Sequence, residues 1–178
     1  MQVGVYGGSF DPPHVGHALV AGWLLWTRQV DEVWLVPAFA HAFDKPLSAF
    51  DRRMALCLAL AEDVDVVRIR VDTVEATLPV PSFTLHTLEV LAGRRPDARF
   101  RLVVGADVLD QVAHWHAWDE ILVRFPPIVV GRAGWPPVPG SPTFPDVSST
   151  EIRRRLAAGE PVDGLVTASV ARLLASPR

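Results

Sequence analysis

Cysteine is almost missing from this chain. Cys57 is the only cysteine among 178 residues, so no disulfide can form within the chain. It lies in an apolar stretch at 54–60, and a lone thiol in such a stretch is typical of a buried helix residue rather than a reactive nucleophile. A sequence without disulfides suits a reducing compartment, and we expect a cytoplasmic protein.

Long apolar runs, targeting signals and a strong excess of charge are also lacking. No uncharged apolar stretch is long enough to span a bilayer. No basic stretch followed by an apolar run opens the sequence, so we expect no signal peptide. A formal net charge of −3 is not the basic excess of a nucleic-acid-binding protein. We therefore expect neither a membrane nor a nucleic acid among the partners.

The patterns that are present indicate an α/β fold. Short apolar segments rich in valine alternate with segments whose apolar residues recur at helical spacing. Strands are expected at 2–6, 31–37, 66–71, 99–104 and 127–130. Helices are expected at 16–27, 50–62, 108–112, 118–123, 149–158 and 168–175, with another that begins at a Ser82 or Thr84 cap and runs to Gly93.

This alternation predicts the architecture. We expect one domain over 1–178, with a Rossmann-like, mainly parallel five-stranded sheet, helices on both faces and a small C-terminal helical portion. Residues 132–147 hold five prolines and are predicted to be an irregular excursion rather than a linker. Ligands of such sheets sit beyond the carboxyl ends of the strands. The segments at 7–17, 38–45 and 105–115 are therefore expected near one another.

The segment after the first strand carries the clearest chemical signal. It reads Gly7-Gly8-Ser9-Phe10-Asp11-Pro12-Pro13-His14-Val15-Gly16-His17. Glycines directly after a strand let the backbone approach a ligand closely, and the start of the following helix offers unpaired N–H groups to phosphate. His14 and His17 are three residues apart, which places both imidazoles on one face of that helix. Gly16 leaves room between them for a bulky anion.

The residues alone leave two other interpretations of this segment open. The glycines can form an ordinary strand-to-helix turn that carries a surface histidine pair. His14 and His17 can also bind a metal together with Asp11, in which case the purified chain would hold stoichiometric zinc.

A second segment, Ser148-Ser149-Thr150-Glu151-Ile152-Arg153, opens a helix near the C-terminus. Ser148 and Glu151 have the spacing of a capping box, so by itself the segment predicts only a helix start. Together, the two segments resemble the two signatures of the HxGH nucleotidyltransferase superfamily, whose members transfer a nucleotidyl group from ATP or CTP. The resemblance implies that His14 and His17 contact the triphosphate, and that the helix start with Arg153 holds its β- and γ-phosphates.

Within that superfamily the chain is most similar, over nearly its whole length, to bacterial nicotinate-nucleotide adenylyltransferases. Residues 81–88 read Pro-Ser-Phe-Thr-Leu-His-Thr-Leu and resemble the segment that lines the nicotinate pocket there. The resemblance implies that Ser82 and Thr84 contact the nicotinate nucleotide. Taken alone, Thr84 and Thr87 can be ordinary cap and core residues.

Gly105, Asp107 and Trp115 resemble another segment of that family. The resemblance places the glycine and the carboxylate on the nucleotide side and the indole against the pyridine ring. Trp115 follows a strand end between two histidines, a poor place for a core residue, whereas Trp118 is expected in the core. A flat aromatic face suits a pyridinium ring, with an attraction of about 0.5–2 kcal/mol.

The loop after the second strand departs from the family pattern Pro-Pro-His-Lys. Here it reads His41-Ala42-Phe43-Asp44-Lys45-Pro46, with its histidine and lysine spaced differently. Lys45 can reach a phosphate of the nicotinate nucleotide or stay a solvated loop residue. The segment between the fifth strand and Ser148 is also shorter than in the family. Both departures leave the choice between nicotinate and nicotinamide mononucleotide open.

The expected reaction is the adenylylation of nicotinate mononucleotide by ATP, which gives deamido-NAD and pyrophosphate. Mg²⁺ is expected to arrive on the phosphates of ATP rather than in a protein metal site. The alternatives are an adenylyltransferase for nicotinamide mononucleotide or phosphopantetheine, and a nucleotide-binding sensor without activity. The residues expected to act on ATP are His14, His17, Arg153, Gly7, Gly8, Ser9, Phe10, Gly16, Gly105, Asp107, Ser148, Ser149 and Thr150; those expected to bind the nicotinate nucleotide are Lys45, Ser82, Thr84 and Trp115.

Overall fold

The computed structural model describes residues 1–40, 46–112 and 115–176. Its strands form a parallel sheet in the order β3-β2-β1-β4-β5-β6. The strands are β1 (Gln2–Gly8), β2 (Glu32–Pro37), β3 (Ile69–Val71), β4 (Arg99–Gly105), β5 (Ile128–Arg132) and β6 (Thr143–Phe144). The helices are α1 (Val15–Trp26), α2 (Phe50–Val64), α3 (Thr84–Arg94), α4 (Trp118–Arg124), α5 (Ser149–Ala157) and α6 (Ala168–Ala175), with 3₁₀ turns η1 (Val74–Thr77) and η2 (Ala106–Val108).

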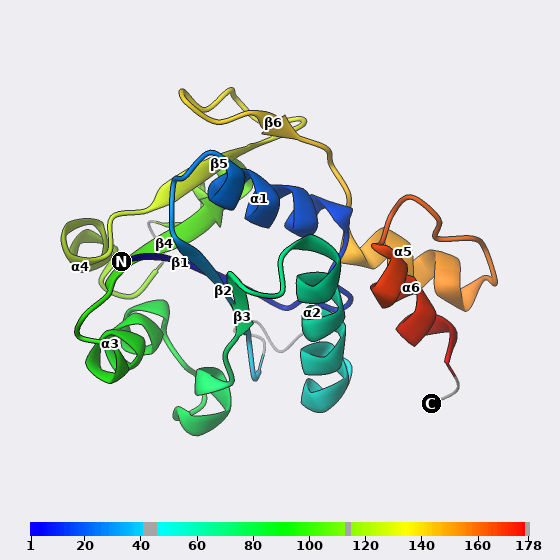
Figure 1. Cartoon of the computed structure of the whole chain (residues 1–178), viewed down its shortest axis with the longest axis horizontal. Helices are drawn as coiled ribbons and strands as arrows, with labels where there is room; N and C mark the ends of the chain where they lie inside the picture. The colour runs from blue at the N-terminus through cyan, green and yellow to red at the C-terminus, as the bar shows by residue number, and fades with distance from the viewer. Residues whose placement is uncertain (41–45, 113–114, 177–178) are drawn as a thin grey trace.

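Helices cover both faces of the sheet, as the sequence predicts (Figure 1). Successive side chains of a strand point to opposite faces, so in β4 Val103 joins one core while Leu102 and Val104 join the other. The first core lies under α1 and α2 and includes Leu24, Leu25, Leu35, Leu56, Leu60 and Ile152. The second lies under α3 and α4 and includes Val3, Val5, Leu88, Leu91 and Ile121.

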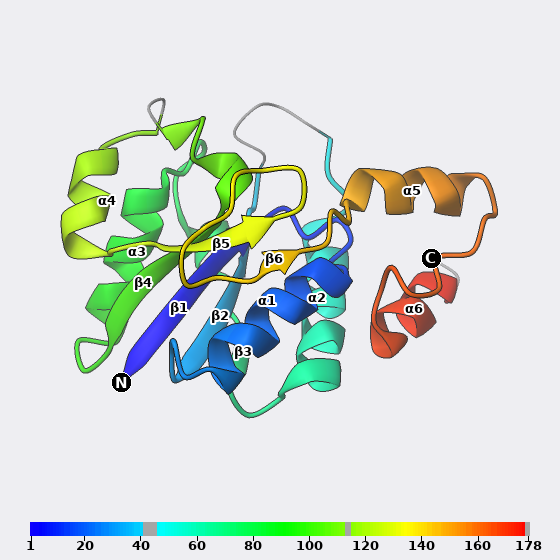
Figure 2. The ribbon, with the colours of Figure 1, turned by 90° about the horizontal axis from the view of Figure 1, so that it is seen from above.

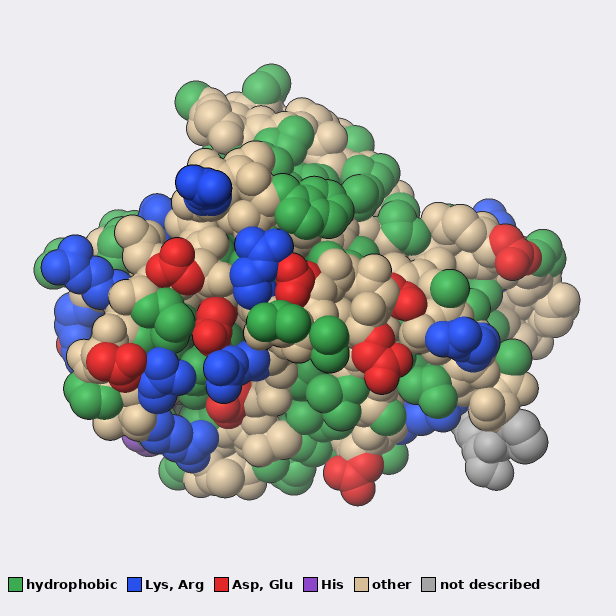
Figure 3. All heavy atoms as spheres, viewed as in Figure 1, with side chains coloured by type: hydrophobic (Ala, Val, Ile, Leu, Met, Phe, Trp, Pro, Cys, Tyr) green, Lys and Arg blue, Asp and Glu red, His purple; other side chains and the backbone are tan. Residues whose placement is uncertain are grey.

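The C-terminal helices form the small extra portion that the sequence predicts. Figure 2 shows α5 and α6 beyond α2, away from α3 and α4. The α6 helix packs against α2, where the backbone N–H and the hydroxyl of Ser169 both donate to Asp63 at 2.7 Å. Acidic and basic side chains are interspersed on the face shown in Figure 3. Among the described residues, no helix is long and apolar enough to cross a membrane.

The strands differ from the prediction in two places. The sheet has six strands rather than five, because β6 forms inside the proline-rich segment 132–147 and pairs with β5. Two residues between Pro142 and Pro145 are too few to show an alternating pattern. The third strand begins at Ile69 rather than at 66, because the Asp65 carboxylate accepts the N–H groups of residues 67 and 68 and closes a turn there.

The predictions for two helices also need correction. The helix expected at 108–112 is instead the 3₁₀ turn η2, followed by turns. Neither Ser82 nor Thr84 caps α3; its N-cap is Phe83, which makes no side-chain cap hydrogen bond. The hydroxyl of Ser82 donates to the Glu75 carboxylate instead.

The strand order places a crevice at the centre of the sheet. From β1 the chain builds outward through β2 and β3, and then returns to the other side of β1 to build β4, β5 and β6. The connections after β1 and β4 therefore leave the sheet in opposite directions. Such a switch point opens a crevice at the carboxyl ends of the strands, which is where ligands bind in folds of this class.

Candidate functional site

A large cavity of about 1120 Å³ occupies this crevice. It is of the size that holds substrates or cofactors in other proteins. Every candidate site residue in the described part of the chain lines it. They are Gly7, Gly8, Ser9, Phe10, His14, Gly16, His17, Ser82, Thr84, Gly105, Asp107, Trp115, Ser148, Ser149, Thr150 and Arg153. Lys45 lies outside the described residues.

The loop after β1 exposes its backbone to the cavity. A Cβ on Gly7 would meet no protein atom within 4 Å, so the space beside this residue is free for a ligand. Phe10 is buried with a φ of 46°, a strained left-handed conformation that tends to occur at functional sites. The buried guanidinium of Arg53 donates to the carbonyl of Ser9 in this loop (2.9 Å) and to the carbonyl of Ser48 before α2 (3.0 Å). It therefore attaches the loop to α2.

The two histidines stand side by side at the start of α1. Their ring centroids are 3.8 Å apart, and the His17 ring also packs on Phe10 at 4.8 Å. The Nδ1 atom of His17 accepts the backbone N–H of His14 at 3.1 Å. A neutral His17 therefore carries its proton on Nε2 and is a hydrogen-bond donor there. A Cβ on Gly16 would lie 3.0 Å from Nδ1 of His14, so glycine is needed between the rings.

Burial keeps both imidazoles neutral. It lowers the pKa of His14 to about 4, with a further contribution from the positive charge of Arg132. Burial also holds the pKa of His17 well below its ordinary value, helped by His14 and then Arg132. Nδ1 of His14 is buried and has no hydrogen-bond partner within the described part of the chain. Near neutral pH the pair offers hydrogen bonds rather than positive charge.

The second motif touches the first directly. Ser149, in the first turn of α5, donates to the carbonyl of Pro12 at 2.9 Å, and Arg153 donates to the carbonyl of Asp11. The Ser148 side chain caps α5 by accepting the N–H of Glu151 at 3.2 Å, as the capping-box spacing predicts. Two segments more than 130 residues apart therefore form one wall of the cavity. The free N–H groups at the start of α5 and the Arg153 guanidinium suit an anion.

A chain of charged side chains links the ends of β4 and β5 to the segment before α5. Arg132, at the end of β5, bonds to Asp107 after β4 and to Asp146 at 2.8 Å before α5. Burial alone would lower the pKa of Arg132, but its bonds to the two carboxylates outweigh this effect and raise it. Burial, and then the charge of Asp107, raise the pKa of the nearby Tyr6 hydroxyl. A Cβ on Gly105 would overlap the Asp107 carboxylate, so a larger residue at the end of β4 would have to displace that side chain.

The far end of the cavity is formed by the start of α3 and by Trp115. The indole of Trp115 is half-buried and packs edge-on against Trp118, with ring centroids 5.6 Å apart. Both indoles pack against the second core, as the sequence predicts for Trp118, and Trp115 lines the cavity as well. Beneath α3, the buried Glu75 carboxylate accepts the hydroxyl groups of Ser82 and Thr87.

Several residues that shape this site are not part of either sequence motif. Arg132 is the last residue of β5, at the carboxyl edge where ligands bind, and its position just after the strand predicted at 127–130 was a usable signal. Arg53 lies at a core position of α2, where a charged residue indicates a specific partner. Glu75 gives no local signal, because its partners come from another element.

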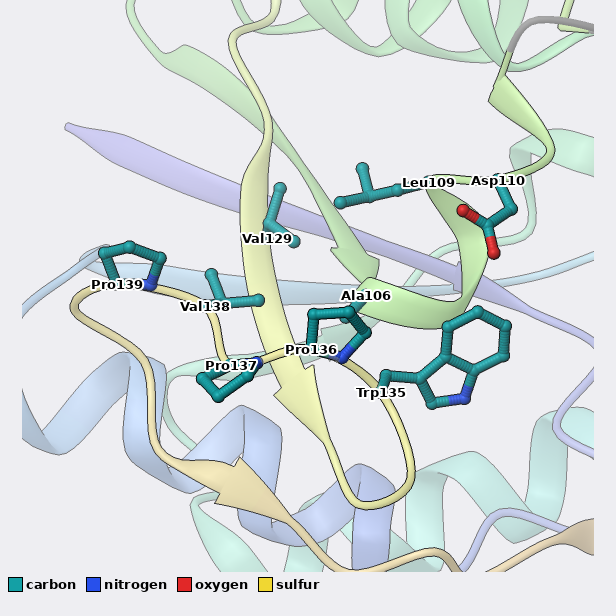
Figure 4. Close-up of a pocket in the computed structure, with 9 residues that line it drawn as sticks. All are labelled: Ala106, Leu109, Asp110, Val129, Trp135, Pro136, Pro137, Val138 and Pro139. Carbon is teal, nitrogen blue, oxygen red and sulfur yellow. The ribbon is translucent and has the colours of Figure 1, made fainter.

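A smaller groove of about 270 Å³ lies beside the cavity (Figure 4). Its walls are η2 and the segment 135–139 that follows β5, and its lining is mainly apolar. Among the described residues, no group of three or more His, Cys, Asp or Glu side chains is placed to hold a metal ion.

Comparisons with known proteins bear on the same residues. A family model described as "Cytidylyltransferase-like" matches residues 5–155. A protein of Anaeromyxobacter sp. (strain K), named "Probable nicotinate-nucleotide adenylyltransferase", is 48% identical over 172 residues, which cover 96% of this chain and 92% of that protein. A protein of Myxococcus xanthus (strain DK1622) with the same name is 38% identical and covers 94% of this chain and 88% of its own length.

A solved structure shares the fold. Plasmodium falciparum nicotinic acid mononucleotide adenylyltransferase complexed with NaAD superimposes with a TM-score of 0.82 at 18% identity. The match covers 97% of this chain and 94% of that chain.

Proposed function

Because the chain belongs to the cytidylyltransferase-like family, and within it to the nicotinate-nucleotide adenylyltransferases, we propose that it joins ATP to nicotinate mononucleotide. The products are deamido-NAD and pyrophosphate, which places the reaction in NAD biosynthesis. The observation that carries the proposal is the meeting of the two motifs, where Ser149 and Arg153 bond to the backbone of Pro12 and Asp11 around one cavity.

The reaction needs little covalent help from the protein. An ionised 5′-phosphate oxygen of the mononucleotide attacks the α-phosphorus of ATP, and the bond from that phosphorus to the bridging oxygen breaks as pyrophosphate leaves. The attacking oxygen carries no proton, so no general base is required. The protein accelerates the step by aligning the two phosphates and by stabilising the charge that moves toward pyrophosphate.

The motif residues have separate parts in this step. We assign the Nε2–H of His17 to the α-phosphate, where the charge changes most, and His14 to the neighbouring phosphates. The N-terminus of α5, with Ser149, Thr150 and Arg153, holds the β- and γ-phosphates. The neutral imidazoles donate hydrogen bonds that burial has already arranged, so little reorganisation is needed during reaction.

The nucleoside parts bind on either side of the phosphates. The backbone at Gly7, Gly8, Ser9 and Phe10 and the carboxylate of Asp107 face the adenosine portion. Ser82, Thr84 and Trp115 receive the nicotinate nucleotide. Lys45 is proposed to reach its phosphate.

Mg²⁺ enters with ATP. The described residues gather no group of metal-ligating side chains, and phosphate oxygens with water are the usual magnesium ligands at such sites. Bound to ATP, Mg²⁺ would neutralise charge on the phosphates, and His14, His17 and Arg153 would hold the phosphates in position. We place the enzyme in the cytoplasm, where the buried thiol of Cys57 stays reduced.

An acceptor panel tests the proposed function. The purified chain is supplied with ATP and Mg²⁺, and with nicotinate mononucleotide, nicotinamide mononucleotide or phosphopantetheine, and pyrophosphate release is measured. We expect the highest kcat/KM with nicotinate mononucleotide. A higher kcat/KM with either of the other acceptors would reassign the substrate. If no acceptor led to pyrophosphate release, the chain would instead be a nucleotide-binding protein without this activity.

A further inference from the structure

Glu75 is a buried carboxylate at the acceptor end of the cavity. Its side chain lies on η1 and is only 9% exposed. It accepts hydrogen bonds from the hydroxyl groups of Ser82 and Thr87. Among the described residues, no lysine, arginine or histidine forms an ion pair with it. A buried charge must be compensated by hydrogen bonds. The carboxylate of Glu75 therefore holds the hydroxyl groups of Ser82 and Thr87 beside it.

These two hydroxyl groups flank the start of α3. The helix begins at Thr84 after its N-cap Phe83, and both residues line the cavity. It has neither an acidic residue in its first turn nor a side-chain cap, although a negative charge nearby stabilises a helix N-terminus. Glu75 supplies that charge from another element. The carboxylate accepts the hydroxyl groups of Ser82 and Thr87 rather than backbone N–H groups of the helix. The N–H groups of residues 84–86 donate to no described residue.

We propose that Glu75 is a positioning residue for the acceptor nucleotide. The carboxylate holds Ser82 before the helix start and Thr87 one turn into the helix. It thereby fixes the position of Phe83 and Thr84, which lie between them and line the cavity. Glu75, Ser82 and Thr87 also line the cavity, but the role we assign to the carboxylate is to position the start of α3 rather than to bind the acceptor. The inference rests on the proposed function, because it assumes that the start of α3 receives the nicotinate nucleotide.

A second tie between the same two elements provides the control. Arg94, at the other end of α3, bonds to Thr77 of η1 at 3.3 Å and pairs with Asp72 at 3.7 Å. Along α3, Arg94 lies seven residues, or roughly 10 Å, beyond Thr87. Losing the Arg94 tie therefore weakens the attachment of η1 to α3 without moving the end of α3 that faces the cavity.

The test compares steady-state constants for the variants Glu75→Gln and Thr87→Val with those of the wild-type enzyme. Glu75→Gln weakens both hydrogen bonds to the carboxylate and Thr87→Val removes one of them, so we expect the KM for nicotinate mononucleotide to rise about tenfold. The KM for ATP should stay within about twofold, because the phosphate-binding motifs lie on other elements. Thr87→Ser restores a hydroxyl group and should return the acceptor KM toward the wild-type value.

The control variant Arg94→Gln should lower the unfolding temperature and leave both KM values unchanged. An acceptor KM that does not move in Glu75→Gln and Thr87→Val, or an ATP KM that rises equally, would overturn the proposal. The wild-type enzyme separates the two hypotheses. If it uses nicotinate mononucleotide while the variants behave like wild type, only the role of Glu75 fails; if it does not use that acceptor, the proposed function fails and takes this inference with it.

Discussion

At the scale of single residues, we propose that the reaction depends most on the position of the His17 imidazole. Its Nδ1 is occupied by the His14 backbone, which leaves Nε2–H as a donor. We expect His17→Ala to lower turnover about 10²-fold, as the loss of a donor to a developing charge does in other enzymes. Pyrophosphate release gives the rate, and circular dichroism checks that the fold persists. His86→Ala, at an exposed position of α3, is the matched control and should turn over normally; a His17 variant as fast as this control contradicts the assignment.

The same burial makes stability depend on pH. Burial depresses the pKa of His14 to about 4 and that of His17 well below its ordinary value of about 6.5. Between these values the unfolded chain binds more protons than the folded one. The stabilising contribution is therefore complete above about pH 6.5 and is lost as the pH falls through the folded pKa. Each histidine lowers the free energy of unfolding by up to about 1.4 kcal/mol per pH unit in that window.

Urea unfolding between pH 7.5 and 4.5 measures this dependence. The measurement compares the wild type with His14→Gln. Both proteins contain the same carboxylates, so the titration of these groups cancels in the comparison. We expect the variant to lose stability less steeply as the pH falls. Parallel curves would show that His14 is not held neutral by the fold.

At the scale of elements, the short strand β6 connects the sheet to the second motif. Gly131 of β5 faces it, and a Cβ there would lie 2.7 Å from the carbonyl oxygen of Pro142. We expect Gly131→Ala to push β6 away and to destabilise the fold by about 1–3 kcal/mol. Because β6 leads into Ser148, the KM for ATP should rise as well. Thermal unfolding and ATP kinetics are the measurements.

Gly93→Ala is the matched substitution. A Cβ on Gly93, inside α3, meets no atom within 4 Å. Alanine in a helix is favoured over glycine by about 1 kcal/mol, so this variant should be more stable than wild type. If Gly131→Ala and Gly93→Ala had the same unfolding temperature and the same KM for ATP, β6 would contribute nothing to the position of the second motif.

Elements differed in how well the sequence predicted them, for identifiable reasons. The strands β1, β2 and β4 are long enough to show apolar patterns, and turn residues mark their ends. The strand β6 has two residues, and its pairing is decided by β5 rather than by its own composition. The α3 helix was placed correctly, but its cap was not, because the nearby Glu75 competes for the hydroxyl of Ser82.

At the scale of the whole molecule, the site was predictable where it depends on contiguous residues. The strings at 7–17 and 148–153 and the rule about strand ends were sufficient to place His17 and Arg153 on one cavity. Glu75 was not predictable in the same way, because tertiary folding brings its partners together, and for Arg132 only the position at a strand end was a signal. The interpretation of 1–178 as one domain, and the role of Lys45, stay predictions.

The last prediction concerns the C-terminal helices, which lie away from the chemistry. Asp63 of α2 accepts two hydrogen bonds from the buried Ser169 of α6. In Asp63→Ala both donors lose their charged acceptor, so the free energy of unfolding should fall by about 1.5–3 kcal/mol. Turnover at 20 °C should stay within about twofold of wild type, because the paired imidazoles are held by Phe10 and the His14 backbone rather than by α6.

Chemical denaturation and pyrophosphate release, measured on the same preparations, check both parts of this expectation. The control is Asp163→Ala, at an exposed position between α5 and α6, which should change neither quantity. The backbone N–H of Val15, at the start of α1, donates to the carbonyl of Leu165 at 2.9 Å and links the segment before α6 directly to the helix that carries the histidines. If turnover falls in parallel with stability, that contact transmits the position of α6 to the active site, and the C-terminal helices belong to the catalytic framework rather than only to the fold.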